Sequence, residues 1–293
     1  MVLDCRAVAK LLEVQELKTT FATAAGLVRA VDGVSWDVNE GETVALVGES
    51  GSGKSVTARI ILGLLQRLPN ARISGQVMFD GRDLEKLGEA ERYALRGTAM
   101  SMIFQDPTSA LNPVFNIDVL FHEVLKRRNP SISAQEARAK AKAALEEVAI
   151  TEPERVLQSY SFQLSGGMNQ RVMIAMALVN EPKLLLADEP GTALDVTVQA
   201  QTLKLMADLV ERHGTSVLFI SHNLGVVREF ADRVYVIYKG RIVETGPTEA
   251  LFDNPQHPYT KALLRAVPRI TGGGIPDISE DTGDFYAPMV VHS

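Results

Sequence analysis

The stretch GESGSGKS, from Gly48 to Ser55, has the residue types and the spacing of a phosphate-binding loop. It matches GxxxxGK(S/T) at every fixed position. Gly48, Gly51 and Gly53 permit backbone angles that a Cβ atom would forbid, so successive N–H groups can turn toward phosphate oxygens. Lys54 can then reach the β- and γ-phosphates, and the Ser55 hydroxyl can ligate Mg²⁺. The alternative interpretation is a glycine-rich turn that binds nothing.

The elements on either side of this stretch suit phosphate binding. Residues 43–47 have the pattern of a short buried strand, and the apolar residues after Ser55 recur at helical spacing. A helix that starts at the loop adds the positive end of its dipole to the site. The predicted nucleotide-contacting residues are Gly48, Glu49, Ser50, Gly51, Ser52, Gly53, Lys54, Ser55 and Val56.

Further along the chain, acid and amide side chains follow two buried-strand candidates. Asp188 ends an apolar strand, where it can hold Mg²⁺, and Glu189 can orient or deprotonate a water molecule. A lone acidic pair of this kind is otherwise a solvated turn. Gln105 follows the strand candidate at residues 100–104, where it can reach a metal or water. Its alternative is a capping or turn residue.

Three weaker signals accompany these motifs. Ser165, Gly166 and Gly167 precede an apolar helix and make a second possible anion-binding helix start, or simply a serine N-cap. Phe21 can stack on adenine or pack as a strand residue. His222 is the one histidine that directly follows a strong strand.

The order of the elements predicts an α/β fold with an antiparallel β region first and an inserted helical part at about residues 111–179. The expected strands are 11–22, 27–31, 34–38, 73–80, 100–104, 183–190 and 216–221, with a closing hairpin of 234–238 and 241–244. The expected helices are 84–96, 119–128, 134–148 and 196–212. A tail follows, and its acidic, glycine-rich end at residues 271–293 is expected to be loosely ordered.

Composition narrows the class of protein. The 293 residues are 46% hydrophobic and 23% charged, as in an ordinary soluble globular protein. The formal net charge of −6 leaves no global basic footprint for nucleic acid. One cysteine, Cys5, excludes an internal disulfide and suits a reducing compartment. No apolar run is long enough to span a membrane, so we expect any membrane contact to be made through a partner.

Together these features resemble the nucleotide-binding subunit of an ABC transporter, over roughly residues 11–246. GESGSGKS resembles the Walker A motif, LSGGM the signature, LLLADEP the Walker B motif with its catalytic glutamate, and ALD, ending at Asp195, the D-loop. Gln105, His222 and Phe21 stand where the family has its Q-loop glutamine, switch histidine and adenine-stacking aromatic. In the family the signature residues and the D-loop face the nucleotide of a second subunit.

The resemblance implies a P-loop NTPase (RecA-like) core with an N-terminal antiparallel β subdomain and an inserted α-helical subdomain. The implied ATP-binding domain covers residues 11–246, and a tail of oligopeptide-transporter type covers residues 247–293. ATP and Mg²⁺ are the implied ligands. Ser55, Gln105 and Asp188 are the predicted Mg²⁺ ligands, and Lys54, Gln105, Glu189 and His222 are the predicted catalytic residues.

The subfamily looks like the oligopeptide, dipeptide and nickel importers. The segments LSGGMNQRVMIAMAL, DEPGTALDVTVQAQ, SHNLGVV and NPQHPYTKALL are all similar to that group. Met168 replaces the common Gln of the signature, as is frequent in this subgroup. Gly191 and Asn223 stand where Thr and Asp are more usual, so softer packing of the D-loop or the switch-histidine segment is expected. The tail lacks the cysteine cluster of many relatives, so no iron–sulfur cluster is expected.

This resemblance implies an ATPase that powers solute import from the cytoplasmic face of the inner membrane. Its implied partners are a second ATPase subunit, forming a heterodimer, two membrane permease subunits and, indirectly, an extracytoplasmic solute-binding protein. Importers of nickel, opines, glutathione or oligosaccharides are alternatives. A soluble ABC ATPase of translation or DNA repair is disfavoured, because the chain has one nucleotide domain and an acidic balance. An inactive subunit is disfavoured because Lys54, Ser55, Asp188, Glu189 and His222 are all present.

Overall fold

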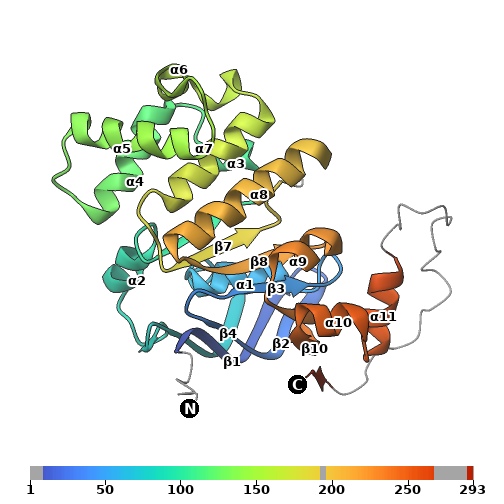
Figure 1. Ribbon diagram of the computed structural model, residues 1–293. Helices are drawn as coiled ribbons and strands as arrows, with labels where there is room; N and C mark the ends of the chain where they lie inside the picture. Colours follow the sequence, from blue (N-terminus) through green and yellow to red (C-terminus); the bar gives the residue numbers. More distant parts are fainter. Residues whose placement is uncertain (1–8, 192–195, 267–288, 293) are drawn as a thin grey trace, which may run out of the picture. The chain divides into compact units, whose positions relative to one another are not determined.

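The structure is a computed structural model that describes residues 9–191, 196–266 and 289–292 (Figure 1). The chain forms two compact units, and each is described by itself. The first unit contains Met1–Lys86 and Leu218–Ser293, and the second contains Leu87–Val217. The phosphate-loop motif belongs to the first unit, whereas the signature and the Asp188–Glu189 pair belong to the second.

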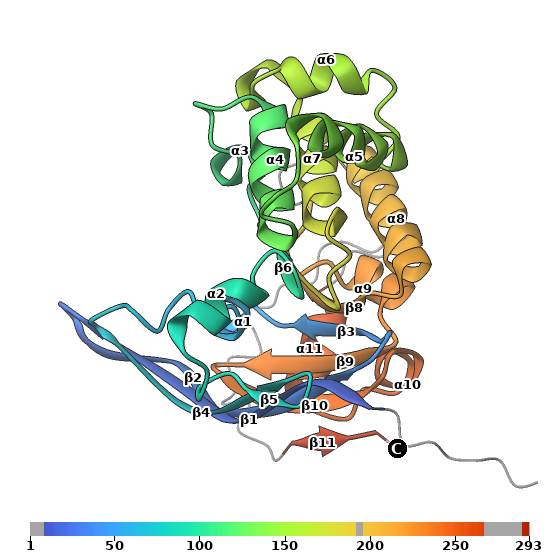
Figure 2. The same cartoon turned by 90° about the vertical axis from the view of Figure 1, so that its left-hand side faces the viewer.

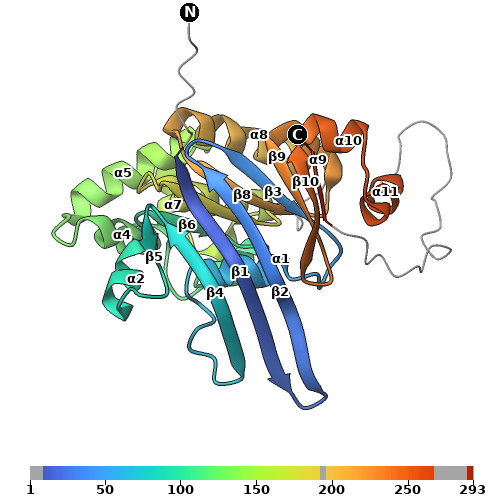
Figure 3. The same cartoon turned by 90° about the horizontal axis from the view of Figure 1, so that it is seen from below.

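A four-stranded antiparallel sheet with the order β2-β1-β4-β5 opens the first unit, and its long strands lie side by side in Figure 3. The strands are β1 (Lys10–Thr23), β2 (Gly26–Asn39), β4 (Ala71–Phe79) and β5 (Arg82–Asp83). The sequence predicted two short strands where β2 is continuous. The register jumps at Gly33, whose φ is +75°, so a bulge interrupts the residue alternation without ending the strand.

The strands that carry the phosphate loop form a second layer of the first unit, in the order β11-β10-β9-β3-β8. They are β3 (Thr43–Val47), β8 (Ser216–Ser221), β9 (Arg233–Tyr238), β10 (Arg241–Pro247) and β11 (Val290–Val291). β3 runs parallel to β9, from Val44 opposite Arg233 to Val47 opposite Val236. The loop after β3 leads into α1 (Lys54–Ile61), so a buried, hydrogen-bonded strand delivers the loop to its place.

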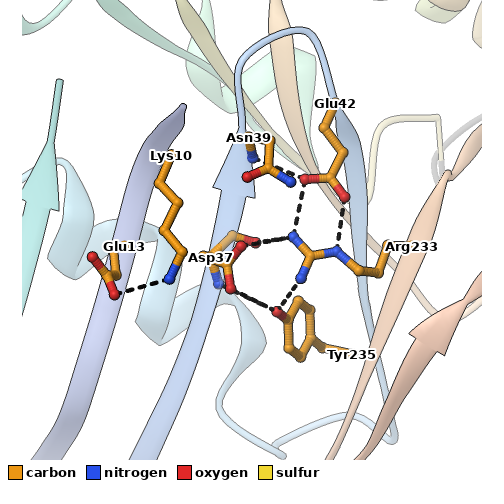
Figure 4. A network of polar contacts seen from close by, with 7 residues as sticks. All are labelled: Lys10, Glu13, Asp37, Asn39, Glu42, Arg233 and Tyr235. Carbon is orange, nitrogen blue, oxygen red and sulfur yellow. Dashed lines mark hydrogen bonds and ion pairs between the residues drawn. The ribbon is translucent and has the colours of Figure 1, made fainter. Parts of the chain in front are cut away.

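A half-buried ion-pair network holds β9 against the turn that leads into β3 (Figure 4). The Arg233 guanidinium bonds Asp37 at 2.9 Å and Glu42 at 2.7 Å. Burial alone would lower the pKa of Arg233, but these hydrogen bonds raise it above its usual value. Burial raises the pKa of Tyr235, whose hydroxyl accepts from Arg233 and donates to Asp37, to about 12. The end of β2 and the turn that leads to β3 are therefore linked to β9 through the side chains of Asp37, Glu42 and Arg233.

The second unit is mainly helical, and α4, α5 and α7 pack side by side in it (Figure 2). Its helices are α2 (Glu89–Leu95), α3 (Pro107–Ala110), α4 (Ile117–Arg128), α5 (Ala134–Glu147), α6 (Pro153–Gln158), η1 (Ser161–Gln163), α7 (Gly166–Leu178) and α8 (Val196–His213). Two parallel strands, β6 (Met100–Ile103) and β7 (Leu184–Asp188), pair within it. α2 begins later than predicted, because Gly88 donates its N–H to the Glu91 carboxylate and fixes the start there.

The tail of the first unit is more structured than the sequence predicted. After α9 (Leu224–Phe230) and the β9–β10 hairpin come α10 (Thr248–Asp253) and α11 (Pro258–Arg265). β11 pairs parallel to β10, with Glu244 opposite Val290, which contradicts the expectation of a loosely ordered end at residues 289–292. The rest of that expectation lies outside the described residues. No helix in the described parts of the chain is long and apolar enough to cross a membrane.

Candidate nucleotide site

The Walker A loop, residues 48–55, approaches its neighbours so closely that two of its positions accept only glycine. A Cβ atom on Gly48 would lie 2.1 Å from the Ile237 carbonyl oxygen, at the end of β9. A Cβ atom on Gly53, whose φ is +105°, would lie 2.4 Å from the Ala30 carbonyl oxygen of β2. The loop is thus held between β2 and β9, and the two glycines that the motif requires have a steric cause.

Lys54 folds back into this loop. Its side chain is buried, with 4% of the residue exposed, and its Nζ donates to the carbonyl oxygens of Gly48 and Glu49 at 2.8 Å each. The buried Ser52 Oγ has no hydrogen-bond partner among the described residues. A buried polar atom without a partner is costly, so this hydroxyl points to a ligand that satisfies it.

The first turn of α1 is open to an anion. Its N-cap is Gly53, which makes no side-chain capping bond, and no acidic residue stands in that turn. Ser55 and Val56 are half-buried at the same end. Backbone N–H groups and the helix dipole here suit the phosphates of a nucleotide. The Walker A loop therefore fits the predicted role of Gly48 to Val56.

Two contacts support the loop from outside, and the sequence did not reveal either of them. Gly240, in the β9–β10 turn, donates its N–H to the Ser52 carbonyl oxygen at 3.0 Å. Tyr259, in α11, accepts a hydrogen bond from the Glu49 N–H on its hydroxyl at 2.9 Å. The segment NPQHPYTKALL was noticed only as a likeness to relatives. Its His-Pro pair at a helix start was the signal that a structured element follows.

The carboxylate pair of the second unit lies at the end of β7, as predicted: Asp188 is its last residue and Glu189 follows it. Asp188 is buried, with 2% of the residue exposed, and Glu189 is half-buried. The Gln105 Nε2 donates to the Glu189 Oε2 at 3.0 Å, so the structure brings these two predicted residues together. The backbone of Glu189 is left-handed, with a φ of 48°, a strain of about 1–3 kcal/mol that is typical of functional sites.

The donor set is suitable for Mg²⁺. Asp188 offers carboxylate oxygens, Gln105 an amide oxygen and Ser55 a hydroxyl, and Mg²⁺ prefers oxygen ligands of this kind. Asp188 and Gln105 belong to the second unit and Ser55 to the first. The three residues remain the proposed ligands.

The signature segment begins α7. The Ser165 Oγ accepts a hydrogen bond from the Met168 N–H at 3.3 Å, so Ser165 is an N-cap. Ser165 and Gly166 are exposed. A Cβ atom on Gly167 would lie 3.1 Å from Val198 Cγ1 of α8, so the start of α7 lies close to that helix. The N-terminal end of α7 is thus capped by its own serine, and Ser165 and Gly166 remain accessible to solvent.

The other predicted site residues are placed as follows. His222 is exposed directly after β8, and the next residue, Asn223, caps α9 by accepting from the N–H groups of Gly225 and Val226. Asn223 therefore performs the capping that an aspartate would perform. Phe21 is half-buried near the end of β1, opposite Val28 and Ala71. Its role toward adenine stays a prediction.

The D-loop residue Asp195 lies outside the described residues. Gly191, which stands just before that segment, has a φ of +96°, a backbone conformation that a threonine rarely adopts. A Cβ atom at Gly191 would also lie 3.1 Å from the Gln199 Cγ. Gly191 therefore adopts a backbone conformation that the more usual threonine would not favour.

Comparison with known proteins identifies similar sequences. Residues 31–192 match the family model "ABC transporter", and residues 243–284 match "Oligopeptide/dipeptide transporter, C-terminal region". The chain is 53% identical over 259 residues to the peptidoglycan transport ATP-binding protein YejF of Agrobacterium fabrum, covering 88% of this chain and 47% of that protein. It is 47% identical over 276 residues to the oligopeptide transport ATP-binding protein OppD of Bacillus subtilis, covering 94% and 77%. The dipeptide transport ATP-binding protein DppD of Bacillus subtilis is 46% identical, covering 95% and 84%.

Solved structures give the same picture. The dimeric post-hydrolysis structure of the ATP-binding cassette MJ0796 bound to ADP and Pi superposes with a TM-score of 0.71 and 28% identity, covering 81% of this chain and 98% of that chain. The structure of cbiO1 from Clostridium perfringens has a TM-score of 0.67 and 26% identity, covering 84% and 91%. The α/β fold with an antiparallel β part and a helical part, predicted from the sequence, is confirmed by these cassettes.

Proposed function

Because the chain belongs to the ABC transporter family, we propose that it is the ATP-hydrolysing subunit of an importer for oligo- or dipeptides. The observation that carries the proposal is the Walker A loop. Its lysine is buried against the loop's own carbonyl groups, Gly48 and Gly53 are sterically required, and its helix start has no side-chain cap. A loop built in this way suits the phosphates of a nucleoside triphosphate.

The chemistry that we propose is in-line attack of water on the γ-phosphate. Lys54 and the N–H groups of the Walker A loop neutralise the charge that develops on the phosphate oxygens. Glu189 orients the water or accepts its proton, and the Gln105 amide holds the Glu189 carboxylate. His222, exposed at the end of β8, braces the γ-phosphate.

Ser55, Gln105 and Asp188 would hold the magnesium ion. A magnesium ion held there would supply positive charge that offsets the negative charge of the phosphates. The nucleotide in this account is ATP, in line with the ATP-binding relatives and the cassette bound to ADP and Pi. No iron–sulfur cluster enters the account, since the sequence offers a single cysteine as a thiolate ligand.

We propose that the working unit is a head-to-tail pair. Ser165 and Gly166 are exposed at the start of α7, where N–H groups and the helix dipole favour an anion. In a pair, they and the D-loop residue Asp195 would meet the γ-phosphate held by the facing subunit. A heterodimer with a related ATPase is the form we propose, by analogy with the importer subgroup.

An exposed apolar surface in the second unit suits docking on membrane subunits. Val114 is 74% exposed, Phe115 46% and Phe162 68%, and the rings of Tyr160 and Phe162 stack at 5.5 Å. Asn116 and Tyr160 form a β-bridge, so these residues lie on adjoining segments. Apolar groups gathered and exposed in this way mark an interaction site.

We propose that this surface binds a cytoplasmic segment of one of the two permease subunits. The chain would then lie on the cytoplasmic face of the inner membrane. An extracytoplasmic solute-binding protein would supply the solute to the same complex. The peptide class is supported by the match of residues 243–284 and by the named transport relatives.

The variant Glu189→Gln tests the hydrolytic role. It should bind ATP but turn it over about 10²–10⁴ times more slowly, because the general base is lost. Size-exclusion chromatography with ATP should show a trapped pair. The control is Glu181→Gln, which changes an exposed glutamate eight positions earlier in the same unit. Hydrolysis by Glu189→Gln within a few-fold of wild type would place the base elsewhere.

A further inference from the structure

The Gly48–Glu49 peptide is held at both of its ends. Its carbonyl oxygen, on Gly48, accepts from the Lys54 Nζ at 2.8 Å. Its N–H, on Glu49, donates to the Tyr259 hydroxyl at 2.9 Å. A planar trans peptide points its N–H and its C=O in opposite directions. Whatever fixes the direction of the N–H therefore also fixes the Gly48 carbonyl oxygen, which is one of the two carbonyl oxygens that accept from the Lys54 Nζ.

Tyr259 is itself held rigidly. It is buried, with 1% of the residue exposed, and its ring lies 4.4 Å from the ring of Tyr238, at the end of β9. Burial raises the pKa of Tyr259, so the phenol stays neutral at physiological pH and offers a constant acceptor. The group that bonds Glu49 is thus a fixed part of the interior.

The helix that carries Tyr259 is anchored by a buried carboxylate. Glu244 of β10 is fully buried and accepts hydrogen bonds from the backbone N–H groups of Gln256, at 2.7 Å, and His257, at 3.1 Å. The His292 ring, next to β11, contacts the same carboxylate at 2.7 Å. The start of α11 and the end of the chain are therefore both tied to one strand of the first unit.

We propose that Tyr259 is a positioning residue for ATP binding, which acts through the Glu49 N–H to orient the Gly48–Glu49 peptide and hence Lys54. Tyr259 lies within residues 243–284, which match the oligopeptide/dipeptide transporter C-terminal model, so the described part of that region then supports the nucleotide site. This inference presupposes the ATP binding proposed above.

The variant Tyr259→Phe tests it, because it removes the hydroxyl and keeps the ring. The full-length chain should bind a fluorescent ATP analogue about 3–10 times more weakly, as expected for one lost hydrogen bond. In the assembled transporter the KM for ATP should rise by the same factor, with kcat changed less than about twofold. Hydrogen exchange at the Glu49 amide should become faster without nucleotide.

The matched control is Tyr235→Phe, which removes another buried hydroxyl of the first unit, one bonded to Arg233 and Asp37. It should leave the ATP affinity within about twofold of wild type. An equal loss of affinity in this control, or unchanged affinity and unchanged exchange in Tyr259→Phe, would overturn the proposal.

A double-mutant cycle with Glu49→Pro isolates the contact, because proline has no N–H to donate. In the Glu49→Pro background Tyr259→Phe should change the affinity by less than about twofold. A full 3- to 10-fold effect in both backgrounds would show that Tyr259 acts by another route. Failure of the wild-type chain to bind ATP would instead refute the proposed function. The amide-exchange comparison is made without nucleotide and still tests the Tyr259 contact in that case.

Discussion

Two helix starts among the described residues, those of α1 and α7, are suited to anions, and they differ in capping and in burial. α1 starts at Gly53, without a side-chain cap, and its first residue, Lys54, is buried against the loop that precedes it. α7 has Ser165 as its N-cap, which accepts from the Met168 N–H, and Ser165 and Gly166 are exposed. Both ends offer the same dipole, but only one is enclosed.

The difference lies in what surrounds each helix start. The Walker A loop is bounded by Ala30 of β2, by the β9–β10 turn and by Tyr259 of α11, all within one unit. The exposed start of α7 has its serine already used as a cap. An enclosed start can orient a nucleotide on its own chain, whereas an exposed one suits a nucleotide brought by another molecule. The comparison supports the head-to-tail pair proposed above.

The variant Lys54→Ala removes the lysine at the enclosed start of α1 and should have the largest effect on ATP hydrolysis. ATP hydrolysis by the assembled transporter should fall by at least about 10³-fold, and ATP binding should weaken, because a charge aimed at the phosphates is lost. The measurement is phosphate release together with nucleotide titration. Thermal melting is run alongside, since a misfolded variant would mimic the loss. Normal turnover in a folded, assembled Lys54→Ala variant would reject the site.

The variant Ser165→Arg changes the exposed start of α7. A bulky cation at this helix start should slow hydrolysis by about 10²-fold at the partner's nucleotide while this chain's own Walker A loop binds ATP as before. Placing Ser165→Arg and Lys54→Ala in the same chain or in opposite chains separates the two sites. Loss of hydrolysis at the chain's own Lys54 site, with the partner's site spared, would refute the trans arrangement. Full-rate hydrolysis by the isolated monomer would refute the pair itself.

The sequence predicted the parts of this site that depend on local spacing. The Walker A glycines, the strand before them and the carboxylates after β7 follow from short-range patterns, so their elements appear where expected. Strand β8 matched residues 216–221, and helix α5 ended one residue earlier than predicted. The N-cap interpretation of Ser165 also needed only local sequence, and the structure confirms it.

The contacts between distant residues could not be predicted in this way. Tyr259 meets Glu49 across 210 positions of sequence, and Gln105 meets Glu189 across 84. No periodicity links such pairs, because they depend on how strands are ordered in a sheet. Residues 289–292 were misjudged for the same reason: composition predicted a loosely ordered end, but Val290 pairs with Glu244 of β10 and the His292 ring contacts the Glu244 carboxylate.

The variant Glu244→Gln weakens the anchor of α11 beside the Walker A loop and should have the smallest effect on activity. An amide has one acceptor oxygen in place of two, so the variant should lose about 1–3 kcal/mol of unfolding free energy. ATP affinity should fall no more than about threefold, since α11 keeps its other packing and Tyr259 moves only slightly. Denaturant unfolding and nucleotide titration measure the two effects, with the exposed Glu249→Gln as control, expected within about 0.5 kcal/mol of wild type.

The pH dependence of the unfolding free energy tests whether the charge of the Glu244 carboxylate anchors α11. Burial raises the pKa of Glu244, but the hydrogen bonds to it outweigh burial, and the net pKa lies below the ordinary value of 4.5. A carboxyl whose pKa is lower in the folded state stabilises the fold above its unfolded pKa, and that stability is lost as the pH falls through the folded value. Wild type and Glu244→Gln should therefore differ in unfolding free energy most at neutral pH and converge in acid. A difference that stayed constant down to acid pH would show that packing, and not the charge of Glu244, anchors α11.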